Sequence, residues 1–447
     1  MKTHYRYPEG HILVRDFHWD FPIIDHGEGI YLFDKAGRRY LDASGGAFVN
    51  ALGHGVNEVV DAIADQMRKV AYVNGKHFTS EAAEKFADKL ISYAPGKLSR
   101  VSLLNSGSDA VEAALKFALQ YWVELGFKKK NKIIARTPSY HGNTLFSLSV
   151  SARPSYKKYY GPYISPIAFT ACPYEYRCPV ENYNKEASFY YLADLEAVIK
   201  KEGPDNIAAF ILEPMSASSC AASLPPENYL KGVMEICQRY NILTIGDEVA
   251  CGSGRSGEFF ASKHWGFEPD IAVLGKSVNA GYIPLAVTLV REDHLDLFAK
   301  NKSNYLLAHT YLQSPSVAAC GLAVLEYMEK HNLIANCAST GEYLLNQLRT
   351  KLKNHPHVGF VTGKGLLLGL EIVEDKTYKI AFSREKKIIE KLSKAAFENG
   401  AVLWGHYGMA NGVDGDCWVI APPYTMTCAQ ADELVSIIEK TLNDFPF

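Results

Sequence analysis

Short apolar segments and longer amphipathic segments alternate through the middle of this chain. The longer segments, residues 109–125 and 233–240, carry apolar side chains at helical spacing. The short segments are bounded by Gly and Pro, as buried strands commonly are, and cover residues 100–104, 132–135, 207–212, 241–246 and 269–275. This alternation predicts an α/β fold with a large, mainly parallel sheet flanked by helices.

The two ends of the chain have a different pattern. Residues 29–42 predict a β-hairpin around Asp34 to Gly37. Long helices are expected over 316–353, a glycine-punctuated strand within 358–374 and an amphipathic helix over 428–443. We therefore expect both ends to combine into a smaller α+β domain, made of residues 1–60 and 316–447, beside a large domain of residues 61–315.

The bulk properties narrow the class of protein. A length of 447 residues is enough for two or three domains. The net charge of -2 gives no support to a nucleic-acid or anionic-membrane partner. The nine scattered cysteines and the absence of a signal-peptide-like start predict reduced thiols and a cytoplasmic protein.

Asp247 and Lys276 each close one of two neighbouring strand-like segments. Alone, such an Asp usually caps a turn and such a Lys is usually solvated. In one parallel sheet both would lie at the same edge, where α/β proteins bind ligands. An amine and a carboxylate there suit pyridoxal phosphate, because the lysine can form the Schiff base and the aspartate can keep the pyridine nitrogen protonated.

Two further segments complete the predicted cofactor site. Ser106, Gly107 and Ser108 lie between a strand and a helix, where backbone N–H groups and hydroxyls can bind a phosphate; plain helix capping is the alternative. The side chains of Asp109 and Glu112 would have to point away from such a phosphate, because their negative charge would repel it. After the strand beginning at Ile133 comes a second segment, Tyr140-His141-Gly142, which offers an aromatic ring to stack on a heterocycle and a glycine for close backbone approach.

Other motifs are weaker. Residues 252–257 match G-x-G-x-x-G, but Gly266 and Pro269 leave little room for the helix that a dinucleotide site requires. The histidines lack metal-binding spacing, so no metal site is predicted.

Together these segments resemble the class III aminotransferases, which are fold type I pyridoxal-phosphate enzymes. The resemblance covers nearly the whole chain and is carried by residues 29–34, 105–114, 139–144, 213–214, 246–249, 252–257, 269–276, 310–315 and 421–423. It implies that the enzyme is a homodimer with shared active sites, with a tetramer as a further possibility.

The resemblance also implies roles for individual residues. Lys276 would bind the cofactor and shuttle the proton, and Asp247 would pair with the pyridine nitrogen. Val249 and Tyr140 would pack on the two faces of the ring. The remaining expected cofactor-binding residues are Ser106, Gly107, Ser108, His141, Gly142, Glu213 and Thr310, with Thr310 supplied to the phosphate by the neighbouring subunit.

Some positions depart from the family pattern. Ala250 stands where a glutamine often reaches the ring hydroxyl, and Val419 and Gly412 stand where relatives carry a carboxylate-binding arginine. Arg255 and Arg177 are the first candidates for another arginine that could bind the substrate carboxylate. Without an arginine partner, Glu213 has a structural role as its alternative.

These inferences predict a ping-pong transaminase that moves an amino group from an amine or ω-amino acid donor to a keto acid such as pyruvate. The alternative is an aminomutase, racemase or decarboxylase on the same fold, because a fold does not fix the reaction. A scaffold without activity would not need Lys276 and Asp247.

Overall fold

The computed structural model describes residues 2–447, and its centre is a seven-stranded sheet in the order β6-β12-β11-β10-β9-β7-β8. The strands are β6 (Leu98–Leu104), β7 (Lys132–Thr137), β8 (Ala168–Ala171), β9 (Ile207–Leu212), β10 (Leu243–Asp247), β11 (Ile271–Leu274) and β12 (Ala286–Arg291). Only β12 runs against its neighbours, β11 and β6. The predicted large, mainly parallel sheet is confirmed.

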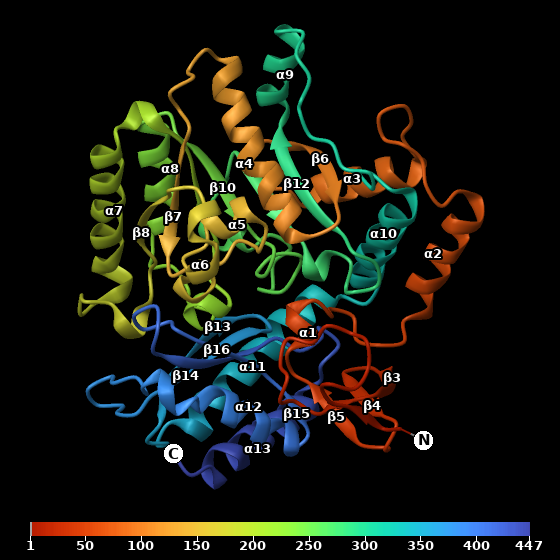
Figure 1. The fold of residues 1–447 in the computed structure, drawn as a ribbon, viewed down its shortest axis with the longest axis vertical. Coiled ribbons are helices and arrows are strands. Elements are labelled where there is room, and N and C mark those ends of the chain that lie inside the picture. Colours follow the sequence, from red (N-terminus) through yellow and green to blue (C-terminus); the bar gives the residue numbers. More distant parts are fainter. Residues whose placement is uncertain (1) are drawn as a thin grey trace.

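Helices cover both faces of this sheet because its strands are apolar on both sides. Within β9, Ile211 packs into the core on the side of α4 (Gly107–Glu124), whereas Phe210 and Leu212 pack toward α7 (Tyr183–Glu202) and α8 (Tyr229–Arg239). Figure 1 shows α4 and α7–α8 on different sides of the strands. This double covering fixes the strand ends, and therefore the loops that follow them, in rigid positions.

The two ends of the chain come together below the sheet, in red and blue in Figure 1. Strand β15 (Ala401–Val402) pairs in parallel with β5 (Arg39–Asp42), which continues to β4 (Tyr31–Asp34) and β3 (Ile24–Glu28). A second four-stranded sheet has the order β13-β14-β17-β16. Helices α11 (Leu333–Leu352) and α12 (Ile388–Glu398) pack on this sheet, and α13 (Cys428–Asp444) packs on both of these helices. Its outer strands are β13 (Val358–Lys364) and β16 (Trp404–Tyr407), and its inner strands are β14 (Leu367–Ile372) and β17 (Asp416–Ile420).

One element differs from its prediction. Residues 358–374 form two antiparallel strands, β13 (Val358–Lys364) and β14 (Leu367–Ile372), rather than one. Gly365, between them, has φ +59, a left-handed conformation that a chain reversal needs and that glycine adopts without strain. The predicted strand over residues 365–371 corresponds to β14, whereas β13, which pairs with it, was not predicted.

The helices between the two parts include α2 (Asn57–Lys69), α3 (Glu81–Tyr93) and α10 (Pro315–Lys330). Helix α10 packs on both α2 and α3. The division of the chain into domains at residues 60 and 315 stays a prediction. None of the helices within residues 2–447 has a stretch long and apolar enough to cross a membrane.

Candidate active site

The carboxyl ends of the parallel strands surround a cavity of about 170 Å³. This volume is far larger than a single water needs, so the cavity has room for an organic molecule. Ten of the predicted site residues line it: Ser106, Gly107, Ser108, Tyr140, His141, Gly142, Glu213, Asp247, Val249 and Lys276. Because these residues follow β6, β7, β9, β10 and β11, the shared strand direction brings them to one edge.

Lys276 is the second residue after β11 and has φ +49, a strained backbone conformation for a residue with a side chain. Burial lowers the pKa of its amine to about 8, an effect that Asp247 and Glu213 oppose and Arg153 adds to. Its Nζ lies 4.9 Å from the centre of the Phe48 ring. A lysine in these surroundings is neutral more often than a solvated one, which makes it a better nucleophile.

Asp247 ends β10 and is held by two hydrogen bonds. Its Oδ2 accepts from Nδ1 of His141 at 2.7 Å, and its Oδ1 accepts from the backbone N–H of Val249 at 3.0 Å. Both side chains are almost fully buried. The carboxylate therefore has a fixed orientation at the cavity wall, as electrostatic stabilisation of a bound cation requires.

The N-terminus of α4 forms another wall of the cavity. The Ser106 hydroxyl caps the helix by accepting from the N–H of Asp109, and no hydrogen bond within residues 2–447 uses the N–H groups of Gly107 or Ser108. A Cβ at Gly107 would lie 2.8 Å from Cγ1 of Val249, so only glycine fits there. These free N–H groups can bind a phosphate.

Glu112, which could have repelled a phosphate, points elsewhere. Its Oε1 accepts from the Thr144 hydroxyl at 2.7 Å and from the N–H of Phe146 at 3.1 Å. The carboxylate thus caps the short helix α5 (Leu145–Ser149) instead of facing the anion site.

Glu213, at the end of β9, does have an arginine partner. Arg136 donates to the Glu213 carbonyl and lies 3.9 Å from its Oε2, while the Ser216 hydroxyl donates to Oε2 at 3.1 Å. Arg136 is at neither of the family's arginine positions, Val419 and Gly412, so Glu213 still lacks its usual partner, and these contacts fit the structural alternative. Arg136 is in β7, where its strand neighbours are apolar and the sequence gives no sign of its pairing across the sheet.

The family profile of the class III aminotransferases matches residues 17–442. This chain belongs to the class III aminotransferases. It is 37% identical over 423 residues to an uncharacterized aminotransferase of Schizosaccharomyces pombe, covering 94% of this chain and 92% of that protein. It is 35% identical over 440 residues to the taurine–pyruvate aminotransferase of Bilophila wadsworthia, covering 96% and 94%.

Solved structures of transaminases have the same fold. The (S)-enantioselective ω-transaminase of Thermomicrobium roseum matches with a TM-score of 0.89 and 32% identity, covering 94% of this chain and 92% of that chain. The predicted family, fold class and enzyme class are confirmed. Class III aminotransferases depend on pyridoxal phosphate, and the geometry of the cavity fits that group: a buried carboxylate, an amine of lowered pKa and a helix N-terminus line one space.

Neither arginine first considered as a carboxylate binder reaches the cavity of this class III aminotransferase. Arg255 is fully buried and donates to the carbonyls of Asn50, Leu366 and Pro422, which connects its loop to segments from both ends of the chain. Arg177 pairs with Glu371 of β14. Both candidates are corrected to structural residues, because their guanidinium groups bind other protein groups and do not line the cavity. No helix follows the 252–257 glycine motif at once, so it has no dinucleotide geometry.

Thr310 lies in an exposed loop and does not line the cavity of its own chain. Its carbonyl accepts from the Tyr72 hydroxyl at 2.8 Å, and the exposed rings of Tyr72 and Tyr311 pack edge to face beside it.

Within residues 2–447, no three His, Cys, Asp or Glu side chains cluster so that they could hold a metal ion.

One residue beside the cavity was missed by the sequence analysis. The Arg153 guanidinium lies 4.3 Å from the centre of the Tyr140 ring, and its Nη2 donates to the Ser218 hydroxyl at 2.8 Å. No motif contains Arg153. Arg153 is twelve residues after His141 in the sequence, and it lies beside the cavity because the chain folds back across helix α5.

Proposed function

We propose that this class III aminotransferase moves an amino group from an amine or ω-amino acid to a keto acid such as pyruvate, in a ping-pong reaction that uses pyridoxal phosphate. The observation that carries the proposal is the shared cavity of Lys276 and Asp247 at neighbouring strand ends. The amine would hold the cofactor's aldehyde carbon, and the carboxylate would face its pyridine nitrogen. When bound, the cofactor supplies an electron-accepting ring that stabilises charge on the donor carbon.

The chain's own residues would do the rest. Lys276 Nζ would carry the proton between the donor carbon and the cofactor, and a pKa of about 8 makes both of its protonation states accessible near neutral pH. Asp247, fixed by His141, would keep the pyridine nitrogen protonated. Val249 and Tyr140 would enclose the ring, and Gly107 and Ser108 would bind the phosphate with their N–H groups.

Two further cavity residues, Gly142 and Glu213, complete the proposed site. A Cβ at Gly142 would lie 2.7 Å from the Ser108 hydroxyl, so this glycine lets the 140–143 segment approach the phosphate end. The Ser108 hydroxyl accepts from the N–H of Asn143 at 3.0 Å, which joins the two segments. Glu213, paired with Arg136, would help to set the charge around Lys276.

The proposed assembly is a homodimer in which Thr310 reaches the phosphate of the other subunit; a tetramer would be two such dimers. Two exposed aromatic residues beside Thr310, Tyr72 and Tyr311, support a protein contact at this surface. The taurine–pyruvate relative supports an ω-amino acid donor and pyruvate as acceptor. Sedimentation of the purified protein tests the dimer, and a monomer with full activity would contradict it.

The function is tested by spectroscopy and by half-reactions. The purified protein should show the visible absorbance of bound cofactor, and Lys276→Ala should lose it while the exposed control Lys231→Ala keeps it. An amine donor added without a keto acid should react with the bound cofactor for a single turnover, after which the reaction should stop. Continued product formation without an acceptor would instead favour the mutase, racemase or decarboxylase alternative. A panel of donors against pyruvate and 2-oxoglutarate then identifies the substrates.

A further inference from the structure

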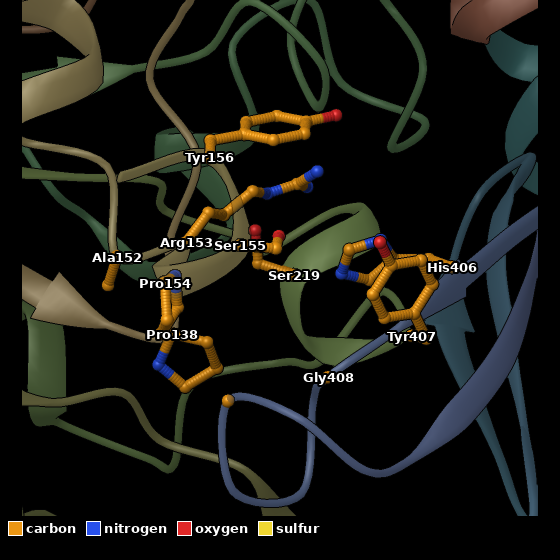
Figure 2. A pocket seen from close by; sticks show the side chains of 11 residues that line it. Pro138, Ala152, Arg153, Pro154, Ser155, Tyr156, Ser219, His406, Tyr407 and Gly408 are labelled. Carbon is orange, nitrogen blue, oxygen red and sulfur yellow. The ribbon is translucent and has the colours of Figure 1, made fainter. Parts of the chain in front are cut away.

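Arg153 immediately precedes α6 (Pro154–Tyr160), and its side chain crosses toward the active-site cavity. Figure 2 shows it extended between Tyr156 and the serines Ser155 and Ser219, with His406 and Tyr407 of the C-terminal domain opposite. The guanidinium packs on Tyr140, a residue of the cofactor cavity, and bonds to Ser218, which also lines that cavity. Arg153 therefore lies at the boundary between the cofactor cavity and its surroundings.

The positive charge of Arg153 has no counter-ion. No carboxylate within residues 2–447 lies within ion-pair distance of it, and its buried Nε has no hydrogen-bond partner there. The buried Nε atoms of Arg136 and Arg255 also lack a partner. Other nitrogens of these two guanidinium groups, however, bind Glu213 and backbone carbonyls, and Arg177 binds Glu371. A partly buried guanidinium with free donors is costly unless a ligand satisfies it.

A second, smaller cavity of about 50 Å³ adjoins the guanidinium. It is lined by Arg153, Tyr156, Ser219, His406 and Tyr407, among others. Ser218 lines the cofactor cavity and the next residue, Ser219, lines this one, so the two spaces are neighbours. A small anion in the second cavity would meet Arg153, while the rest of a short molecule extended toward Lys276.

The loop that faces Arg153 from the C-terminal domain leaves this space open. Gly412 carries no side chain, and a Cβ there would already lie 3.3 Å from Cγ of Pro154. His406 is the other ionisable group of the second cavity besides the tyrosines, and burial, reinforced by the charge of Arg153, holds its pKa well below the usual range. Arg153 is thus the cation of this cavity at neutral pH, and the neutral His406 can only donate or accept a hydrogen bond.

We propose that Arg153 sets donor specificity by binding the acid group, carboxylate or sulfonate, of an ω-amino acid whose amine reaches Lys276. The planar guanidinium can hold two oxygens of such a group at once, and Ser218 fixes it in place. This inference rests on the proposed function, because it names the donor class for the same site.

The test compares donors that differ only in the acid group. Arg153→Gln should lower kcat/KM for 4-aminobutyrate, β-alanine and taurine by about 100-fold, the loss of a charge-assisted contact. For butylamine and propylamine, kcat/KM should change less than about 3-fold, because no acid group is bound. Arg153→Lys should restore part of the loss. Arg239→Gln, an exposed arginine on α8, is the matched control.

A binding measurement makes the test independent of turnover. Butyrate and ethanesulfonate, which have no amine, should raise the melting temperature of the wild-type holoenzyme but not that of Arg153→Gln. The taurine and ethanesulfonate arms separate sulfonate from carboxylate recognition. The visible absorbance of bound cofactor should be the same in all variants, which shows that the fold and cofactor site are intact.

Three results would overturn the inference. Equal losses for acidic and neutral donors would mean that Arg153 only supports the packing of Tyr140. A loss confined to the keto-acid half-reaction would assign the arginine to the acceptor. Wild-type turnover of neutral amines alone, with no stabilisation by the amine-free acids, would exclude an acid-binding role. If no donor reacts with wild-type protein, the proposed function fails instead, and stabilisation by the acids still decides the role of Arg153.

Discussion

Nδ1 of His141 lies 2.7 Å from Oδ2 of Asp247, and both side chains are buried at the wall of the active-site cavity. Since the other oxygen of Asp247 accepts only from the N–H of Val249, the imidazole supplies one of two contacts that hold the carboxylate. His141 is therefore a positioning residue for the group that is proposed to face the cofactor nitrogen.

His141→Leu should weaken cofactor binding and slow the donor half-reaction, each by about 10-fold or more, because a buried carboxylate loses a hydrogen bond. Titration of cofactor-free protein with pyridoxal phosphate measures the first effect and stopped-flow absorbance the second. His141→Gln, which keeps a donor, should recover part of both. Equal damage in the two variants would show that His141 matters only for packing.

Gly107→Ala should reduce cofactor affinity by about 10-fold, since the added methyl group would lie 2.8 Å from Val249 and push the α4 N-terminus out of line. Gly161→Ala is the matched control, because a Cβ there meets nothing within 4 Å and the glycine has a negative φ. Cofactor titration followed by visible absorbance compares the two. Unchanged affinity in Gly107→Ala would remove the phosphate role of this helix end.

The rate at which cofactor-free protein captures pyridoxal phosphate should rise with pH and level off above about 8. Burial lowers the pKa of Lys276 to that value, and only the neutral amine attacks the aldehyde. Below the pKa, each pH unit should therefore change the rate about tenfold. Stopped-flow mixing across the pH range measures it. A rate still rising steeply above pH 9 would indicate an ordinary, solvated lysine.

The same lowered pKa has a consequence for stability. Between the folded value of about 8 and the unfolded value near 10.5, unfolded Lys276 binds more protons than folded Lys276, so its contribution to stability rises with pH. Below about pH 8 the buried ammonium is fully unfavourable. Cofactor-free Lys276→Met should thus be more stable than wild type at pH 7, with an advantage that shrinks toward pH 10; denaturant unfolding tests this trend, and a constant difference would contradict it.

Arg177→Ala should lower the free energy of unfolding by about 3 kcal/mol, because Glu371 would be left as a buried carboxylate without its cation. Arg68→Ala, which breaks an exposed pair with Asp65, should leave stability almost unchanged. Urea denaturation compares them. If Arg177→Ala instead spared stability and raised KM for acidic donors, its assignment as a structural residue would be wrong.

Much of the fold is visible in the sequence because local patterns encode it. The segments ending at Asp247 and Lys276 form neighbouring parallel strands, as their apolar runs predict, and the strand direction then places both residues at one edge. The first strand of the hairpin at 358–372 was missed because Gly359 and Gly363 interrupt its apolar pattern, and it is identified as a strand only by its pairing with β14.

The sequence by itself determined the sheet, the family and the residues at the strand ends, since strand direction and residue order are enough to gather Lys276, Asp247 and the α4 N-terminus. Tertiary structure alone decided what each arginine does. Arg255, Arg177 and Arg153 are equally charged in the sequence. In the structure, backbone carbonyls bind the first, Glu371 pairs with the second, and the third packs on Tyr140 and binds Ser218 without a carboxylate partner within residues 2–447. A guanidinium's role depends on which acceptors reach it, and those acceptors come from segments far apart in the chain.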